Sequence, residues 1–258
     1  MVEDLPRVAP VDPRRGSNQG PSEVRWGYAC PTWFDWDGDG RPDVVYSEIN
    51  GLHWVALATG TEGDAPFPRL SPPRALVDVD AGVPLKTAWR VRPAPLRHPN
   101  GEVDYFCLDE AGALARYEKV APFGLRKAER VATTSGRGIY FTKLRGGALG
   151  RVKLCWANWF GEGPPDLLAG LPAAHDLRDC GGETPVGHAA VVVFRNAGSA
   201  GEPRLEAPRY LIHRRLGRSV PFGRHSCSPE YFEREGRRYL LVGAEDGHFY
   251  LFGREEFR

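Results

Sequence analysis

The stretch DWDGDGRPDVVY, residues 35–46, places an acidic turn directly before a run that favours a β-strand. Gly40 permits the positive φ that bends the chain back on itself, and residues 44–46 are of the β-branched and aromatic types found in strands. Three later segments repeat this plan of a short strand, a polar turn closing on glycine and a β-rich run; they begin at Pro93, Cys155 and Ser228. The chain is therefore built from an internal repeat.

The repeat predicts an all-β fold. Its turn glycines stand 61, 62 and 73 residues apart, at Gly40, Gly101, Gly163 and Gly236. Each unit is long enough for four short antiparallel strands, and such sheets repeated radially are propeller blades. We predict a β-propeller of about four four-stranded antiparallel blades, which either closes a compact ring or forms part of a larger propeller. The approximate blades are residues 25–80, 81–132, 133–215 and 216–258.

Two segments fall outside the regular plan. Residues 1–24 form an N-terminal extension, in which residues 5–12 are expected to complete the last blade. Residues 171–189 are an insertion in the third unit, and long loops on rigid scaffolds commonly carry binding residues. We expect this insertion to be either a binding loop, through His175 and His188, or a variable surface excursion.

Three segments resemble the FG-GAP/VCBS repeat family. Residues 35–48 and 243–252 match the first and second halves of the family unit, and residues 191–208 match its closing strand. The resemblance covers residues 25–258. It implies a β-propeller, usually of seven or eight blades and usually outside the cell, with calcium in the loops between strands. An extracellular or periplasmic location is therefore expected, although residues 1–6 have no basic-then-apolar signal pattern.

The acidic turn has the chemistry of a calcium site. Ca²⁺ takes six to eight oxygen ligands, and carboxylates stand at positions one, three, five and nine of the turn: Asp35, Asp37, Asp39 and Asp43. The backbone carbonyl of Arg41 supplies a further oxygen, whereas an EF-hand would need a glutamate at position twelve, where Tyr46 stands. Crowded carboxylates repel one another without a cation. We predict one structural Ca²⁺ here and none in the other units; the alternative is a solvated turn without an ion.

The composition argues against a nucleic-acid-binding, a membrane-spanning and a zinc-binding protein. Lys and Arg number 34 and Asp and Glu 33, so no overall field would attract nucleic acid. No apolar run reaches the length of a membrane span, so no membrane insertion is expected. The five cysteines show no CxxC spacing, which argues against structural zinc. Cys30, Cys107 and Cys155 are expected to be buried, and Cys180 to be exposed.

Three arginines, Arg90, Arg151 and Arg224, recur upstream of turn glycines. In a propeller this segment lies at or near the innermost strand, so they are candidates for a ring around the central channel. The guanidinium group matches carboxylates bidentately, which would suit an acidic polysaccharide. The alternative is that these arginines pair with acidic neighbours or face solvent.

The sequence shows no nucleophile elbow, phosphate-binding loop or zinc-protease motif. We therefore expect a non-catalytic calcium-binding propeller of the FG-GAP/VCBS type that acts as a scaffold for a polysaccharide or protein ligand, as a monomer or as part of a larger chain. The alternative is a polysaccharide lyase acting on uronate-containing substrates, which rests on fold analogy. An integrin-like ligand head would need a partner chain.

Overall fold

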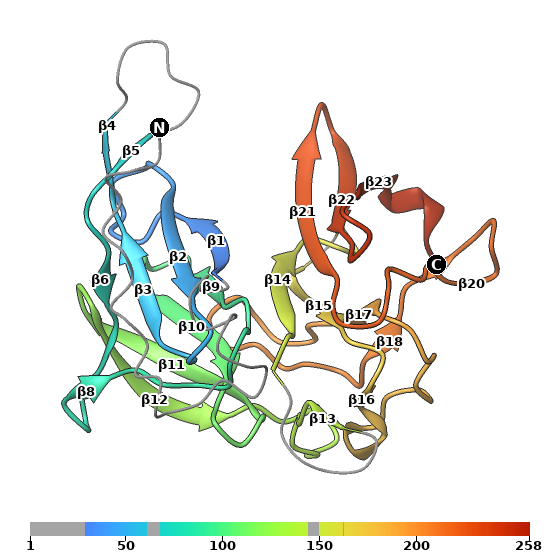
Figure 1. Cartoon of the computed structure of the whole chain (residues 1–258), viewed down its shortest axis with the longest axis horizontal. Coiled ribbons are helices and arrows are strands. Elements are labelled where there is room, and N and C mark those ends of the chain that lie inside the picture. Colours follow the sequence, from blue (N-terminus) through green and yellow to red (C-terminus); the bar gives the residue numbers. More distant parts are fainter. Residues whose placement is uncertain (1–28, 61–67, 144–149, 162) are drawn as a thin grey trace.

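Four β-sheets stand around a common centre and form a four-bladed β-propeller (Figure 1). The computed structural model describes residues 29–60, 68–143, 150–161 and 163–258. The predicted all-β class and the predicted number of blades are confirmed.

The strands of each blade follow one another in sequence. Blade 1 contains β1 (Cys30–Phe34), β2 (Asp43–Ser47), β3 (His53–Ala56) and β6 (Arg74–Ala75). Blade 2 contains β9 (Ala94–Arg97), β10 (Val103–Leu108), β11 (Leu114–Ala121) and β12 (Gly124–Arg130), with β7 (Val77–Asp78) and β8 (Val83–Pro84) at its outer edge. Blade 3 contains β14 (Lys153–Ala157), β15 (Asp166–Leu171), β17 (Ala190–Phe194) and β18 (Arg209–Tyr210). Blade 4 contains β21 (Ser228–Arg234), β22 (Arg237–Gly243) and β23 (Phe249–Gly253).

Among the described residues, short elements lie between or after the blade strands. Three two-stranded ladders are formed by β4 (Ala58–Gly60) with β5 (Arg69–Leu70), β13 (Thr142–Lys143) with β16 (His175–Asp176), and β19 (Ile212–His213) with β20 (Arg218–Ser219). The described ranges also contain two single 3₁₀ turns, η3 (Arg178–Cys180) and η4 (Arg254–Glu256). Within the described ranges, no helix is both long enough and apolar enough to cross a membrane.

Two blades differ from the predicted four strands. Blade 2 has six, because β7 and β8 leave blade 1 and join the outer edge of β12, where β7 pairs in parallel. Blade 4 has three strands among the described residues. The predicted fourth strand, residues 5–12, and the whole extension 1–24 lie outside the described residues.

The four turn glycines occupy the same place in every blade. Gly40, Gly101, Gly163 and Gly236 all connect the first strand to the second, and all have positive φ, between 73° and 90°. A residue with a Cβ is strained in this conformation. The glycine alignment read from the sequence therefore corresponds to a real structural repeat.

The first strands of the blades meet at the centre of the ring. Lys153, at the start of β14, donates to the Arg90 carbonyl at 2.6 Å and lies 3.1 Å from the Cys30 sulfur at the start of β1. Arg92, just before β9, donates to the Leu154 carbonyl at 3.0 Å and pairs with Glu230 of β21 at 2.9 Å. Polar contacts between first strands thus link all four blades.

Apolar side chains fill the spaces between neighbouring blades. An edge-to-face aromatic contact joins blades 1 and 2 (Trp36 and Tyr105, 6.1 Å), and another joins blades 2 and 3 (Phe106 and Trp156, 4.9 Å). All five cysteines are free and buried. The expectation of an exposed Cys180 is wrong, because the insertion folds its sulfur inward, where it donates to the Leu177 carbonyl at 3.1 Å.

A fully buried histidine lies in the interface between blades 1 and 2. The Nε2 atom of His53 is 2.7 Å from the Thr87 hydroxyl, and its Nδ1 atom bonds the Tyr105 hydroxyl. Burial lowers the pKa of His53 from 6.5 to about 3. The ring is therefore neutral in the folded protein at pH values where it would be protonated in the unfolded chain.

This difference predicts a pH-dependent stability. Since the folded pKa lies below the unfolded one, the unfolded chain binds the extra proton, and stability is lost as pH falls below 6.5. Between pH 7 and 5 the His53 contribution should lower the free energy of unfolding by about 2 kcal/mol. Urea unfolding at both pH values should show this loss in the wild type and in the exposed-site control His248→Gln. His53→Gln should lack it, and an unchanged pH dependence in that variant would contradict the assignment.

Candidate functional site

The predicted metal loop brings three carboxylates together. Single oxygens of Asp35, Asp37 and Asp39 lie within 4.8 Å of one another. The loop holds this shape through its own side chains, because Asp35 accepts the amides of Gly38 and Gly40 at 2.7 and 3.2 Å. An oxygen that accepts one amide retains a second lone pair, so these bonds leave ligand positions on all three carboxylates.

The fourth aspartate has a different role. Asp43 is fully buried, and its two oxygens accept the amides of Trp36 and Ala58, both at 2.7 Å. Burial raises the pKa of this carboxyl, and the amide hydrogen bonds oppose that rise. Asp43 therefore fastens the loop to the start of β4 and does not join the three-carboxylate group.

Two arginines already partly neutralise the group. The Arg41 guanidinium pairs with Asp39, and Arg97 of blade 2 lies 3.9 Å from Asp35 and donates to its carbonyl. The donor set is all oxygen and suits a hard cation. A bound Ca²⁺ would be held by the carboxylates of Asp35, Asp37 and Asp39, and Arg41 would have to release Asp39 for a second oxygen to bind.

Blade 3 repeats the fastening aspartate without the acidic group. Asp166 is buried at the start of β15 and accepts the amides of Phe160 and Asn196 at 3.1 and 2.9 Å. The Asn196 bond corresponds to the bond that Asp43 accepts from Ala58, and the Phe160 amide lies one residue beyond the position of Trp36. The buried aspartate is therefore a structural element that blades 1 and 3 share.

A cation from the following blade covers the buried tryptophan in both places. Lys119 of blade 2 donates to the Trp36 carbonyl at 2.7 Å and lies 5.1 Å from its ring. Arg254, after β23, donates to the Trp159 carbonyl at 2.8 Å and lies 4.5 Å from its ring. Sequence reasoning missed this contact; the shared Trp-x-x-Trp spacing at residues 33–36 and 156–159 was its only signal.

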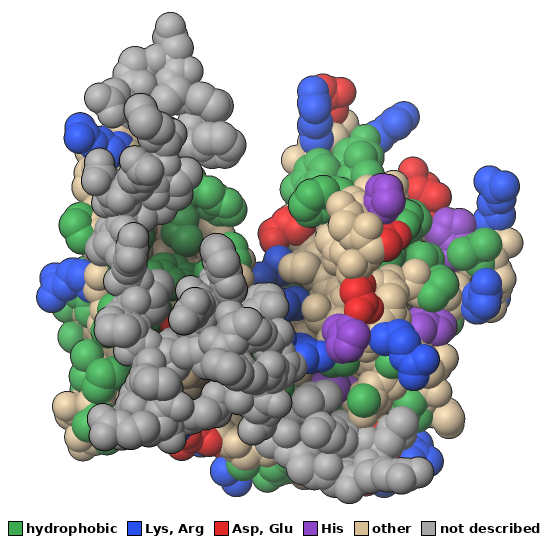
Figure 2. Space-filling view, in the orientation of Figure 1, with side chains coloured by type: hydrophobic (Ala, Val, Ile, Leu, Met, Phe, Trp, Pro, Cys, Tyr) green, Lys and Arg blue, Asp and Glu red, His purple; other side chains and the backbone are tan. Residues whose placement is uncertain are grey.

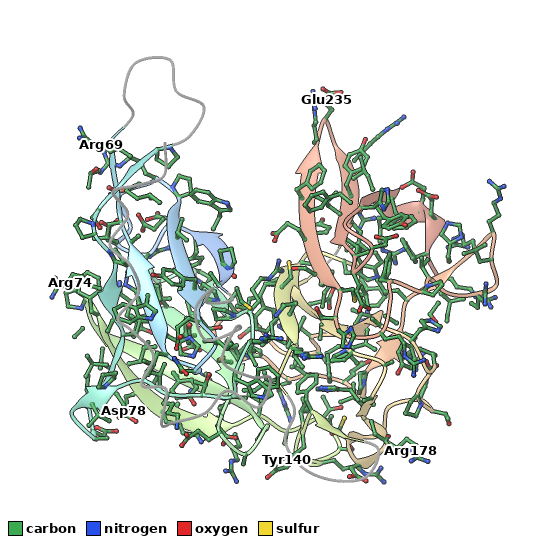
Figure 3. All side chains as sticks on the ribbon, in the orientation of Figure 1. Arg69, Arg74, Asp78, Tyr140, Arg178 and Glu235 are labelled. Atoms are coloured by element: carbon green, nitrogen blue, oxygen red, sulfur yellow. The ribbon has the colours of Figure 1, made fainter. Side chains whose placement is uncertain are left out.

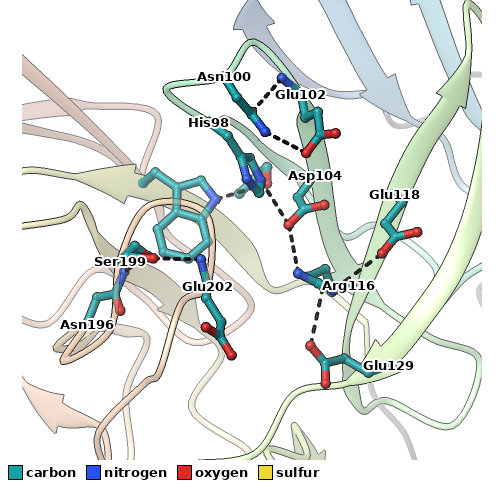
Figure 4. Close-up of polar contacts among 12 residues, drawn as sticks. His98, Asn100, Glu102, Asp104, Arg116, Glu118, Glu129, Asn196, Ser199 and Glu202 are labelled. Carbon is teal, nitrogen blue, oxygen red and sulfur yellow. Dashed lines mark hydrogen bonds and ion pairs between the residues drawn. The ribbon is translucent and has the colours of Figure 1, made fainter.

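Blade 2 uses a buried ion pair at the equivalent position. Asp104 lies 3.0 Å from Nε2 of His98 and 3.3 Å from Arg116, which also reaches Glu118 and Glu129 (Figure 4). Burial raises the pKa of Asp104, and the charge of Arg116 opposes the rise. His98 and Asp104 thus bind each other, and the absence of calcium from the second unit stays a prediction.

The candidate channel arginines do not form one ring. Arg90 and Arg151 lie on the ring of Trp89, 5.0 and 5.2 Å from its centre, and both have positive φ. Arg224 is exposed on another loop, where its carbonyl accepts the amide of Ala173 at 2.9 Å. The structure therefore brings two of the three arginines together.

The insertion separates its two histidines. His175 is buried in β16, with its ring 6.1 Å from Phe141. His188 lies 3.0 Å from the Ser219 hydroxyl, and burial and the charge of Arg218 lower its pKa. Arg178, at the surface of the insertion (Figure 3), pairs with Asp176. These side chains do not converge on the arginines at Trp89.

The different roles of Asp43 and Asp37 predict different stability losses. In calcium-free buffer, Asp43→Ala should lower the free energy of unfolding by about 2–5 kcal/mol, because two buried amides lose their acceptor. Asp37→Ala should change it by less than about 0.5 kcal/mol, because its carboxylate is exposed. Urea denaturation measures both. Equal losses would contradict the assignment of the fastening role to Asp43 and not to Asp37.

Comparison with known proteins assigns no family. No protein-family model matches the chain, and no curated protein matches it. The fold and the contacts above therefore carry the functional argument, and the resemblance to FG-GAP/VCBS repeats stays a prediction.

Proposed function

We propose that the chain is a non-catalytic β-propeller of the FG-GAP/VCBS type that binds one Ca²⁺ at Asp35, Asp37 and Asp39 and acts as a scaffold for a carbohydrate or protein ligand. The observation that carries the proposal is the group of three carboxylates within 4.8 Å, on a loop whose ends are fastened by a buried aspartate. The calcium is structural, because it neutralises the negative charge of the loop beside the contact between blades 1 and 2.

The outer face of blade 4 supports the binding role. Phe249 and Leu251 of β23 are 77% and 58% exposed, and Phe232 stacks on Tyr239 with ring centres 5.2 Å apart. Apolar side chains are visible on this arm of the molecule, which stands apart from blade 1 at the open side (Figure 2). Soluble domains rarely leave adjacent apolar side chains exposed unless the surface binds something.

Geometry favours binding over the lyase hypothesis. Removal of the proton at C5 of a uronate needs a charge-neutralising group and a base in one cleft. Arg90 and Arg151 share the ring of Trp89. Arg224 lies instead against the insertion that carries His175 and His188, and His175 is buried beside Phe141. The extracellular location implied by the resemblance gains no support from the cysteines, since oxidising compartments favour disulfides and all five are free.

Calcium should raise the thermal stability of the wild type. With a Kd of about 1 mM, typical of weak structural sites, about 10 mM Ca²⁺ should stabilise the fold by about 1.4 kcal/mol and raise Tm by roughly 3–6 °C. The double variant Asp37→Ala/Asp39→Ala should show no calcium-dependent shift in Tm. The variant Arg41→Ala should bind Ca²⁺ more tightly than the wild type, because the substitution frees the Asp39 carboxylate.

The control is Asp80→Ala, which removes an exposed carboxylate paired with Arg126 on blade 2. It should respond to calcium as the wild type does. Equal shifts in the wild type and the double variant would refute the calcium site, as would no shift in either protein.

A further inference from the structure

Two surface hollows lie at equivalent places in the ring. One of about 360 Å³ lies between blades 1 and 2, beside Trp36 and Asp37. The other, about 350 Å³, lies between blades 3 and 4 and is lined by Asn158, Phe160, Gly161, Glu233, Gly236 and Arg238. The turn glycine of the following blade borders each hollow. Both volumes fall at the low end of the range of small-molecule sites, about 300–1,000 Å³.

The chemistry of the second hollow differs from that of the first. Taking Trp36 and Trp159 as equivalent, Asp37 lines the first hollow where Phe160 lines the second. Asn158 of the second hollow stands at the position of Asp35, which does not line the first. Two carboxylates are thus replaced by an amide and an aromatic ring. Phe160 is 40% exposed although its neighbour Trp159 is buried. The second hollow therefore offers an exposed aromatic ring and hydrogen-bonding groups, whereas the first is lined by Asp37, Glu102 and mostly apolar side chains.

Three arginines surround this aromatic pair. The guanidinium of Arg195 lies 5.2 Å from the centre of the Phe160 ring, and that of Arg254 lies 5.7 Å from it. Arg238, which lines the hollow, donates to the Trp159 carbonyl at 3.1 Å. Burial lowers the pKa of Arg254, and the positive charge of Arg238 lowers it further. Positive charge is therefore concentrated here.

Glu233, the acidic side chain that lines this hollow, already accepts hydrogen bonds from neighbouring side chains. Oε1 of Glu233 accepts hydrogen bonds from the Asn158 amide at 3.3 Å and from the Tyr231 hydroxyl at 2.5 Å. Burial and this carboxylate both raise the pKa of Tyr231, which keeps its hydroxyl a donor. Carboxylates also lie near these arginines, because Asp166 and Glu255 both oppose the lowering of the Arg254 pKa. Arg195, which is exposed, and Arg238, which lines the hollow, are the guanidinium groups offered to a ligand anion.

We propose that the hollow between blades 3 and 4 binds an acidic sugar, with the sugar ring against Phe160 and its carboxylate or sulfate ester at Arg238 and Arg195. Asn158 and Glu233 offer an amide and a carboxylate for ring hydroxyls. The combination of an exposed aromatic ring, planar hydrogen-bonding groups and guanidinium groups matches a ligand that is apolar on one face, hydroxylated at its edge and negatively charged. The inference rests on the proposed scaffold function and names the ligand class of one site.

The test uses the full chain and titration calorimetry. The probes are a galacturonic-acid tetramer, the same tetramer as its methyl ester, a sulfated galactose oligosaccharide and a neutral galactose oligosaccharide. At least one acidic probe should bind, and the neutral probes should bind at least tenfold more weakly. Whichever acidic probe binds more tightly identifies the anionic group as carboxylate or sulfate.

Two variants locate the site. Phe160→Ala and Arg238→Gln should each weaken binding of the acidic sugar at least tenfold. The controls Leu216→Ala and Arg126→Gln, which alter exposed side chains outside the hollow, should not. Thermal melts confirm that each variant is folded, and Phe160→Tyr should retain binding if the loss in Phe160→Ala reflects the missing ring.

Equal binding of the acid and its methyl ester would overturn the role of the anionic group. Unchanged affinity in Phe160→Ala and Arg238→Gln would place the sugar elsewhere and overturn the site, while leaving the scaffold function intact. Failure of both acidic probes to bind overturns the inference. The calcium titration tests the proposed function separately, so the two failures are distinguishable.

Discussion

The arrangement of the blades around one centre depends on the contacts of the buried Arg92 guanidinium. This group sits where the first strands of three blades meet, and donates to the Leu154 carbonyl of blade 3 and the Pro229 carbonyl of blade 4, while pairing with Glu230. A buried charge is tolerated only when its hydrogen bonds are satisfied. These partners come from β14 and β21. Moving either blade outward would therefore leave the buried guanidinium without its hydrogen-bond partners. Stacking of the blades is thereby coupled to one side chain at the centre.

The blades alternate in character around this centre. Blades 1 and 3 carry a buried tryptophan and an aspartate that fastens the loop before the second strand, and blades 2 and 4 supply the cation that covers the tryptophan. The alternation divides the ring into two similar pairs, each enclosing a surface hollow. The two pairs of blades differ in their exposed loop residues, whereas both have the buried tryptophan, the fastening aspartate and the covering cation. Asp37, Glu102 and apolar side chains line one hollow, and Phe160 with Arg238 lines the other.

The sequence predicted the features that local rules determine. Glycine at a positive φ marks the same turn in every blade, so Gly40, Gly101, Gly163 and Gly236 were recognisable without coordinates. The acidic turn was likewise predictable, because Asp35, Asp37 and Asp39 are close in sequence. Contacts between distant residues were not: Lys119 and Trp36 are 83 residues apart, and Arg254 and Trp159 are 95 apart.

Where the sequence analysis erred, burial explains the difference. Cys180 stands in a polar, glycine-rich stretch that favoured exposure, yet the insertion folds back and buries it. Asp43 carries the same side chain as the exposed aspartates of its loop. Only its burial and its two amide partners give it a different role from theirs. The arginines Arg90, Arg151 and Arg224 share a sequence position relative to the turn, but only Arg90 and Arg151 meet, at the ring of Trp89, whereas Arg224 lies against the insertion.

The most direct test of the central claim is amide hydrogen exchange in the wild type and in Arg92→Met, a variant that keeps the side-chain length and removes the charge. If Arg92 holds the first strands around one centre, protection should fall together in β9, β14 and β21, although the latter two are distant in sequence from the substitution. A fall confined to β9, with β14 and β21 as protected as in the wild type, would contradict the account.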